Sequence, residues 1–260
     1  MKKAKSYPNA TAFRSALETR LQTLAQKENT DLQRLRREVA FDRFLARLFL
    51  RKDAPWVLKG GYAMELRMRE ARATKDIDLA WKEVFPKGKG SPNQMILAEL
   101  QEAAAEDLRD FFVFLVGQPD EGIEAAPYGG ARFPVEARID GRLFVTFHVD
   151  MGIGDVVIEP YEETKGRDWL EFAGIPPAKV RAIPKEQHFA EKIHAYTQPC
   201  QTTNSRVRDL VDMILLIDSG KMNKVKTRKA IEATSKKREP TQFQRNWPHR
   251  RMNGKNHSWH

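Results

Sequence analysis

Two aspartates separated by a single residue, Asp76 and Asp78, are the first candidates for chemistry in this 260-residue chain. They lie in the segment DIDLAW at positions 76–81, where carboxylates alternate with apolar residues as in a β-strand. Side chains alternate across a strand, so both carboxylates point to the same face. Such a pair repels unless a cation lies between its members, and Mg²⁺ takes one or two carboxylates plus substrate phosphates. The pair predicts a Mg²⁺ site, and its alternative is two solvated charges at a strand edge.

A double glycine precedes the aspartates. The apolar run at positions 56–58 ends at Gly60 and Gly61, and a periodic segment follows, which predicts strand, glycine turn, short helix and strand. Glycine lets backbone N–H groups approach a phosphate where a Cβ would obstruct it. Phosphates on glycine amides and a metal on Asp-x-Asp are together typical of nucleotidyl transfer.

These motifs resemble those of a known family. LKGG at 58–61 followed by ATKDIDL at 73–79 is similar to the signature of the AbiEii/AbiGii nucleotidyltransferase-like toxins, within the DNA polymerase β-like nucleotidyltransferase superfamily. The resemblance covers roughly residues 56–216. It implies an α+β fold, in which a polymerase β-like nucleotidyltransferase core with a mixed sheet is flanked by N-terminal and C-terminal helices.

A second block supplies a third carboxylate. Asp150 ends a predicted strand, and GIGD follows at 152–155. The superfamily places its third metal ligand on a strand neighbouring Asp-x-Asp, so the resemblance implies Mg²⁺ on Asp76, Asp78 and Asp150. We interpret Asp155 as a turn that ends the strand, and His148 as a partly exposed strand histidine.

A third block lies on two predicted helices, 183–196 and 206–216. EKIHA at 191–195 and the triad Arg206, Asp209 and Asp212 are again similar to the AbiEii family. The resemblance implies that Lys192 meets the nucleotide phosphates and that Asp209 belongs to the same site. Asp212, one turn further on, is the alternative for that role. Without the resemblance, we would interpret Lys192 as a solvated helix lysine. Asp209 would then be the partner of Arg206 in a surface ion pair.

The residues so implied fall into two sets. The catalytic set is Asp76, Asp78, Asp150, Lys192 and Asp209. The nucleotide-binding set is Lys59, Gly60, Gly61, Lys192 and Asp212.

The family implies an enzyme that transfers a nucleotide from an NTP to an acceptor. The resemblance further implies the toxin of a type IV toxin–antitoxin pair, with Mg²⁺ as cofactor, a cognate antitoxin gene product as partner, and the 3′ end of tRNA or another RNA as acceptor. Two other functions stay open on the residues alone: an NTP-binding module without turnover, and a small-molecule (aminoglycoside-type) nucleotidyltransferase.

The amino-acid composition indicates the class of protein and the compartment in which we expect it. With 41% hydrophobic and 31% charged residues, the chain reads as soluble and globular. A single cysteine, Cys200, excludes an internal disulfide framework and fits a reducing cytoplasm. No signal peptide or transmembrane run is evident, so we expect a cytoplasmic protein without a membrane partner. The net charge of +10 favours polyanions, although much of the excess lies beyond Lys221.

The other elements follow from periodicity. Helices are predicted over 9–28, about 31–51 and 93–110, and the arginines of the second helix (34, 36, 37, 43 and 47) are interpreted as a solvated face. The apolar run 111–116 predicts a strand buried on both faces. Two strands, 131–139 and 142–151, are joined at Asp140-Gly141, a strong hairpin signal.

We therefore divide the chain into an N-terminal helical segment (1–53), a nucleotidyltransferase core (54–175), a C-terminal helical segment (176–238) and an atypical basic tail (239–260). The tail has no period. Back-translated with permissible codons and read one base earlier, residues 239–259 give a peptide that resembles the family's usual Pro-rich ending. We hypothesise a frameshift near Arg238, the alternative being a basic disordered tail. The nucleotide sequence of the gene distinguishes the two.

Overall fold

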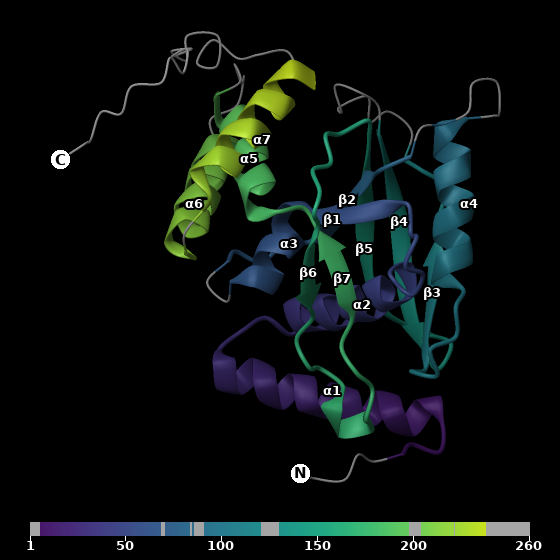
Figure 1. The fold of residues 1–260 in the computed structure, drawn as a ribbon. Helices are drawn as coiled ribbons and strands as arrows, with labels where there is room; N and C mark the ends of the chain where they lie inside the picture. The colour runs from purple at the N-terminus through teal and green to yellow at the C-terminus, as the bar shows by residue number, and fades with distance from the viewer. Residues whose placement is uncertain are drawn as a thin grey trace, which may run out of the picture.

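The centre of the molecule is a mixed β-sheet whose strands follow the order β3-β4-β5-β2-β1-β7-β6 (Figure 1). The computed structural model describes residues 6–68, 71–83, 85, 91–120, 130–197, 204–220 and 222–237. The strands are β1 Trp56–Lys59, β2 Asp76–Trp81, β3 Phe112–Val116, β4 Gly130–Ile139, β5 Arg142–Ile153, β6 Glu162–Lys165 and β7 Lys179–Ala182. The pairs β2–β5 and β1–β7 are parallel, and the other pairs are antiparallel.

Helices surround this sheet. They are α1 Ala10–Glu28, α2 Leu32–Leu48, α3 Gly60–Arg67, α4 Pro92–Ala104, α5 Lys185–Thr197, α6 Asn204–Asp218 and α7 Lys224–Lys237. Asn9 caps α1 and Asp31 caps α2, each accepting a backbone N–H three residues on. Helix α2 packs on β5 and β7, whereas α5, α6 and α7 form a group at one side (Figure 1). The predicted α+β fold with flanking helices is confirmed.

None of the helices in the described part of the chain is both long and apolar enough to cross a membrane.

The hairpin predicted at Asp140-Gly141 is present, and both residues have the positive φ that a two-residue turn of this kind requires (+58° and +69°). Its two strands do not pair without interruption. Arg138 pairs with Leu143 and Ala137 pairs with Val145, so Phe144 is an extra residue on β5. This bulge shifts every pair beyond it by one residue, as far as the end of the strand.

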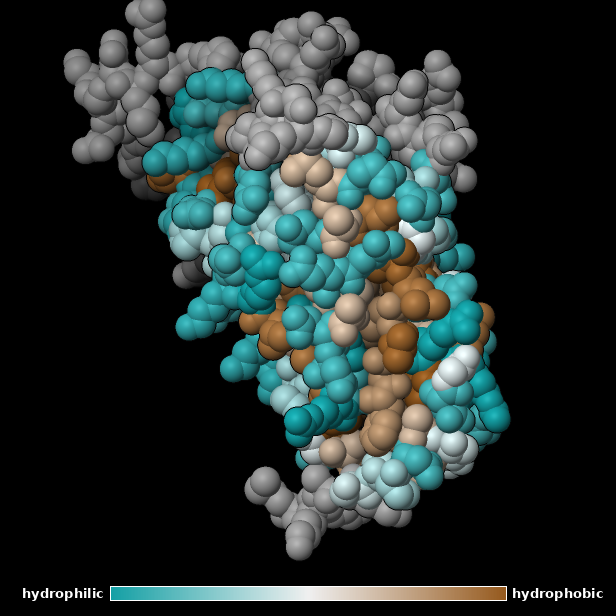
Figure 2. All heavy atoms as spheres, turned by 90° about the vertical axis from the view of Figure 1, so that its right-hand side faces the viewer, coloured by the Kyte–Doolittle hydropathy of each residue, from teal (hydrophilic) through white to brown (hydrophobic). Residues whose placement is uncertain are grey.

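The strand at 112–116 is not buried on both faces as predicted. It is β3, at the edge of the sheet, where Val113 is 56% and Leu115 49% exposed while Phe112, Phe114 and Val116 enter the core. A run of apolar residues resembles an interior strand whether or not a helix covers its second face. The side of the molecule that carries β3 and α4 shows a band of hydrophobic residues (Figure 2).

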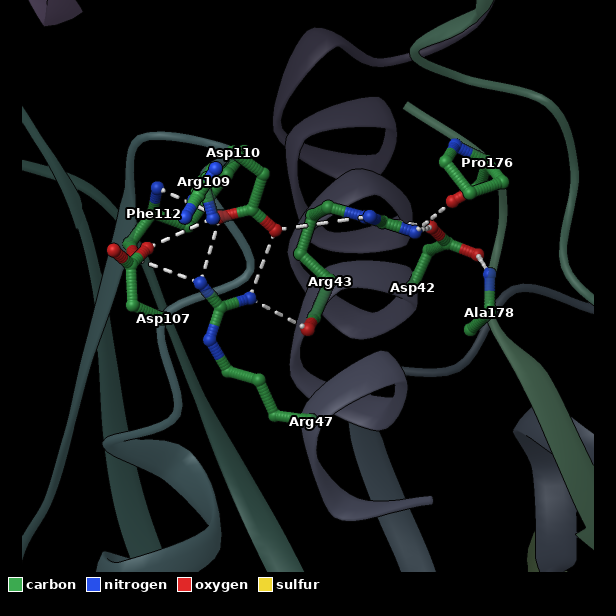
Figure 3. Close-up of polar contacts among 9 residues, drawn as sticks. All are labelled: Asp42, Arg43, Arg47, Asp107, Arg109, Asp110, Phe112, Pro176 and Ala178. Carbon is green, nitrogen blue, oxygen red and sulfur yellow. Dashed lines mark hydrogen bonds and ion pairs between the residues drawn. The ribbon is translucent and has the colours of Figure 1, made fainter. Parts of the chain in front are cut away.

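The prediction of a solvated arginine face is wrong for two of its members, Arg43 and Arg47, which are buried (Figure 3). Arg47 donates to both carboxylate oxygens of Asp110 at 2.9 and 2.6 Å. Arg43 donates to Asp42 and, at 2.7 Å, to the carbonyl of Pro176. Apart from Asp42 on the same helix, their partners lie outside α2, which helical periodicity does not reveal. The network fastens α2 to the sheet.

Other differences concern short or polar segments. Strands β6 and β7, four residues each, were not predicted, and α4 ends at Ala104 rather than near 110. Helix α7 occupies 224–237, where many lysines weaken the apolar pattern. The tail 239–260 lies outside the described residues.

Candidate active site

Strand pairing brings the three predicted carboxylates together. In the parallel pair β2–β5, Asp76 lies opposite His148 and Asp78 lies opposite Asp150. The half-buried positions of β2 are the aspartates, and the apolar residues between them are buried, so Asp76 and Asp78 share a face as predicted. Asp150 alternates in the same way on β5. The carboxylates therefore come from neighbouring strands on one side of the sheet.

The double glycine brings helix α3 directly against Asp78. Gly60 has φ +64°, and a Cβ on it would lie 2.0 Å from Oδ2 of Asp78. The Gly61 N–H donates to that same oxygen at 3.3 Å. A side chain at position 60 is thus excluded by both conformation and space. The amide that was expected to meet a phosphate meets a carboxylate here.

Asp78 carries a charge that the fold accommodates poorly. Burial raises the pKa of this carboxyl, and the neighbouring Asp150 raises it further; Lys59, the Gly61 N–H and Lys192 act in the opposite direction. The outcome is a pKa of about 6 instead of 3.8. At neutral pH the carboxylate is therefore ionised at a position where burial disfavours its charge.

This shift predicts a pH-dependent stability. Because the folded-state pKa of Asp78 is raised, its contribution is fully present below about pH 4 and is lost as pH rises through about 6. The variant Asp78→Asn has no titrating carboxyl group at this position, so it does not show this loss of stability. The free energy of unfolding of the variant, relative to that of wild type, should increase from pH 4 to pH 8 by up to about 3 kcal/mol.

Urea unfolding in EDTA at a series of pH values measures this difference. Asp53→Asn is the control. Asp53 is an exposed acid, and its hydrogen bond with Arg51 lowers the pKa of the Asp53 carboxyl. Its difference from wild type should not grow above pH 5. A difference for Asp78→Asn that stays constant from pH 4 to pH 8 would contradict the assignment.

Asp155 does more than end a strand, which corrects the interpretation from sequence. Its buried carboxylate forms a short ion pair with the ammonium group of Lys59 at the end of β1. Gly152 makes room for this pair, since a Cβ there would lie 2.3 Å from Asp155 and 2.9 Å from the Lys59 ammonium. Burial lowers the pKa of Lys59, but Glu191, Asp155 and Asp78 together raise it above its usual value. Lys59 remains a charged group at the site.

Arg132 on β4 was not recognised from the sequence. It lies opposite Asp150 in the β4–β5 pairing, and its Nε and Nη2 each donate to a separate oxygen of Asp150 at 2.6 Å. The same Nη2 lies 3.8 Å from Asp76. His148, also passed over, has its Nδ1 3.3 Å from Asp76. Nothing in the sequence around Arg132 signals this contact, because Asp150 lies 18 residues further along the chain.

The predicted Lys192 is part of a buried group of charges. Its ammonium lies 3.0 Å from Asp209 and 2.7 Å from Asp212, and Arg72 lies 3.6 Å from Asp212. The side chains of Lys192, Asp209 and Asp212 are 13%, 16% and 1% exposed. Lys192 is therefore not a solvated helix lysine, and its charge is close enough to Asp78 to lower the pKa of that carboxyl. Both candidate aspartates of α6 contact it.

Helix α5 is held in place from two sides. Gln187 accepts from the Ile158 N–H at 2.8 Å and donates to the carbonyl of Val156, which fixes the loop after Asp155. Arg67 at the end of α3 donates to the carbonyl of Ile183 just before α5. The arm that carries Lys192 is therefore anchored to both the glycine motif and the Asp155 loop.

Within the described residues, no three His, Cys, Asp or Glu side chains converge closely enough to hold a metal ion as they stand. The contacts above explain this arrangement. Asp150 and Asp76 turn toward Arg132, and Asp78 turns toward the N-terminus of α3.

Comparison with solved structures finds nucleotidyltransferase-like folds. The nucleotidyltransferase toxin MenT4 from Mycobacterium tuberculosis has a TM-score of 0.57 and 15% identity, over 82% of this chain and 68% of its own. JHP933 from Helicobacter pylori has a TM-score of 0.44 and 17% identity, over 72% and 66%. At these identities the similarity to MenT4 concerns the fold alone. The similarity to JHP933 is too weak to support a conclusion.

A search of curated proteins by sequence finds no match. The model of one protein family, described as nucleotidyl transferase AbiEii toxin of type IV toxin–antitoxin systems, matches residues 43–255. This match includes every residue of the candidate site. The chain therefore belongs to the AbiEii family of nucleotidyltransferase toxins of type IV toxin–antitoxin systems.

Proposed function

We propose that this nucleotidyltransferase uses Mg²⁺ held by Asp76, Asp78 and Asp150 to transfer a nucleotide from an NTP to RNA, with the 3′ end of tRNA as acceptor. One observation carries the proposal. Asp78 and Asp150 lie opposite each other on parallel strands, at the N-terminus of α3 and within electrostatic reach of Lys192.

The residues present fit a divalent cation. Carboxylate oxygens are the hard ligands that Mg²⁺ prefers. Burial and the neighbouring Asp150 raise the pKa of Asp78, so a further cation there would stabilise its charged form, and the Arg132 guanidinium already lies close to both Asp150 and Asp76. When bound, Mg²⁺ would neutralise charge developing on the α-phosphate and on the leaving pyrophosphate.

The other groups of the site suit a triphosphate and an acceptor. Lys59 and Lys192 are cationic, and the N-terminus of α3 adds a partial positive charge. Together with Gly60 and Gly61 they would hold the phosphates of the NTP. The carboxylates then position the attacking hydroxyl in line with the leaving group.

The distribution of charge favours a polyanionic acceptor. Helix α7 packs on α5, the helix that carries Lys192. Its exposed side chains include Lys224, Lys226, Arg228, Lys229 and Lys236, and one acidic residue, Glu232, lies among them. A basic helix beside the site is what contact with RNA phosphates requires. We expect the reaction to occur in the cytoplasm, because NTPs and tRNA are found there.

Incubation with each α-³²P-labelled NTP, Mg²⁺ and total cellular RNA tests the function, with a parallel set of aminoglycoside acceptors. Label should enter tRNA, and periodate treatment of the RNA, which destroys the 3′-terminal diol, should prevent it. Label only in small acceptors would support the aminoglycoside-type alternative. No transfer with any acceptor, despite NTP binding, would leave a binding module.

Lys192 offers a test of the nucleotide site. If its ammonium meets the β- and γ-phosphates, Lys192→Gln should weaken NTP binding by about 1.5–3 kcal/mol, the range for a charge-assisted contact. Because Asp212 is buried beside it, the same change should also lower stability, by a few kcal/mol. Isothermal titration and urea unfolding measure the two effects. NTP affinity equal to wild type would remove Lys192 from the site.

Substitutions of the two aspartates on α6 should have different effects, because the two side chains differ in burial. Asp212 is enclosed by Lys192 and Arg72, so Asp212→Asn should chiefly destabilise, by roughly 3 kcal/mol. Asp209 is more accessible than Asp212, and Asp209→Asn should cost turnover with a smaller loss of stability than Asp212→Asn. Side-by-side turnover and unfolding measurements decide the assignment. The reverse pattern would make Asp212 the functional carboxylate.

A further inference from the structure

Arg132 occupies the place where a cation is needed. Its guanidinium makes two hydrogen bonds of 2.6 Å, one to each oxygen of Asp150, and lies 3.8 Å from Asp76. Both donors come from one planar group, which gives the fork geometry of a bidentate Arg–carboxylate pair. Two of the three carboxylates proposed to hold Mg²⁺, Asp76 and Asp150, thus already share one cationic side chain of the protein.

This contact and a metal ion compete at Asp150. The fork takes a lone pair on each oxygen of the carboxylate, and the guanidinium brings a full positive charge that repels a divalent cation. Among the described residues no three potential ligands converge. Asp76, Asp78 and Asp150 must therefore turn before they can hold one ion, and a turn of Asp150 weakens its fork with Arg132.

The contact depends on a specific irregularity of the sheet. The bulge at Phe144 shifts the hairpin register so that Arg132 lies opposite Asp150. An uninterrupted hairpin from the same turn would place Ala131 opposite Asp150, with its side chain on the same face and without charge. The backbone N–H of Asp120 donates to the carbonyl of Arg132 at 2.9 Å, which holds this part of β4 in place.

We propose that Arg132 is a built-in counter-cation, which holds Asp150 and Asp76 in the metal-free enzyme, competes with the divalent ion for their oxygens, and is released when the ion binds. The inference rests on the proposed metal site. It adds a residue that sets the affinity of this site for metal and couples metal loading to a change in the position of a side chain.

Titration of the full chain with Mn²⁺, followed by the EPR signal of the free ion, tests the competition. Arg132→Gln should bind Mn²⁺ about tenfold more tightly than wild type. Arg138→Gln is the matched control, because Arg138 lies on the same strand in a 2.7 Å ion pair with Glu136 and is similarly exposed. Its Mn²⁺ affinity should stay within twofold of wild type. The Mn²⁺ binding that is lost in Asp78→Asn is the binding that belongs to the proposed site.

Thermal unfolding gives a second measurement. Without metal, Arg132→Gln should melt below wild type, because Asp150 and Asp76 lose their counter-cation. Saturating Mn²⁺ should raise its melting temperature by more than it raises that of wild type, since affinity and stabilisation are linked. Arg138→Gln should show the wild-type increment.

Each outcome decides. Mn²⁺ affinity in Arg132→Gln that equals or falls below wild type, while Asp78→Asn abolishes binding, overturns the competition and leaves the metal site standing. Absence of Asp78-dependent binding in every variant removes the metal site and this inference together. If Arg132→Gln does not fold, Arg132→Lys replaces it: lysine keeps the charge but loses the fork, and a several-fold tighter Mn²⁺ affinity supports the proposal whereas an unchanged one overturns it.

Discussion

Asp78→Asn is expected to abolish nucleotide transfer while the protein stays folded. The carboxylate lies opposite Asp150 at the N-terminus of α3, and the proposed chemistry requires its negative charge. Loss of a metal ligand removes several kcal/mol of transition-state stabilisation, so the rate should fall at least about a thousandfold. Asp76→Asn should have an effect of the same order. In cells, both variants should lose toxicity.

The fold should survive because Asp78 is a source of repulsion in the metal-free protein. Glu136→Gln is the matched control, since Glu136 is a half-exposed carboxylate on β4 that pairs with Arg138. Its transfer rate should be within a factor of two of wild type. The assignment fails if Asp78→Asn retains a rate within tenfold of wild type, or if its loss of activity comes with loss of the cooperative unfolding transition.

The largest effect on stability is expected at Asp110. This carboxylate is fully buried, accepts two hydrogen bonds from Arg47 and one from the Phe112 N–H, and lies 3.7 Å from Arg43 (Figure 3). Asp110→Ala leaves the guanidinium of Arg47 buried without its anion. Breaking a buried ion pair from one side costs about 3–5 kcal/mol. For a chain of this length that corresponds to a fall in Tm of roughly 10 °C.

Asp53→Ala is the control, because Asp53 and Arg51 form an exposed ion pair with a distance of 3.4 Å. Exposed pairs of this kind contribute little to stability. A second variant separates charge from packing: replacement of both partners, Arg47→Met with Asp110→Leu, should recover much of the loss, since an apolar pair leaves no unmatched charge. Equal destabilisation by Asp110→Ala and Asp53→Ala would show that the network contributes no more than a surface pair.

The sequence by itself determined the local features whose signals are periodic. Asp76 and Asp78 had to share a face, because side chains alternate along any strand. Asp140-Gly141 had to turn, because few other pairs accept positive φ at both positions. The resemblance to AbiEii toxins, carried by the glycines, Asp-x-Asp and the two downstream helices, indicated the family, which the comparisons confirm. It also pointed to Asp150 and Lys192, whose roles remain proposals.

Only the tertiary structure decided which charges meet. The hairpin turn alone would pair Ala131 with Asp150, and a single extra residue at Phe144 brings Arg132 there instead. Arg47 looked like any exposed arginine, because its partner Asp110 is 63 residues away in the chain. Lys59 and Asp155 are 96 residues apart. Periodicity reports the face on which a side chain lies, whereas register, bulges and packing between distant elements set its partner, and the energy of a charge depends on that partner.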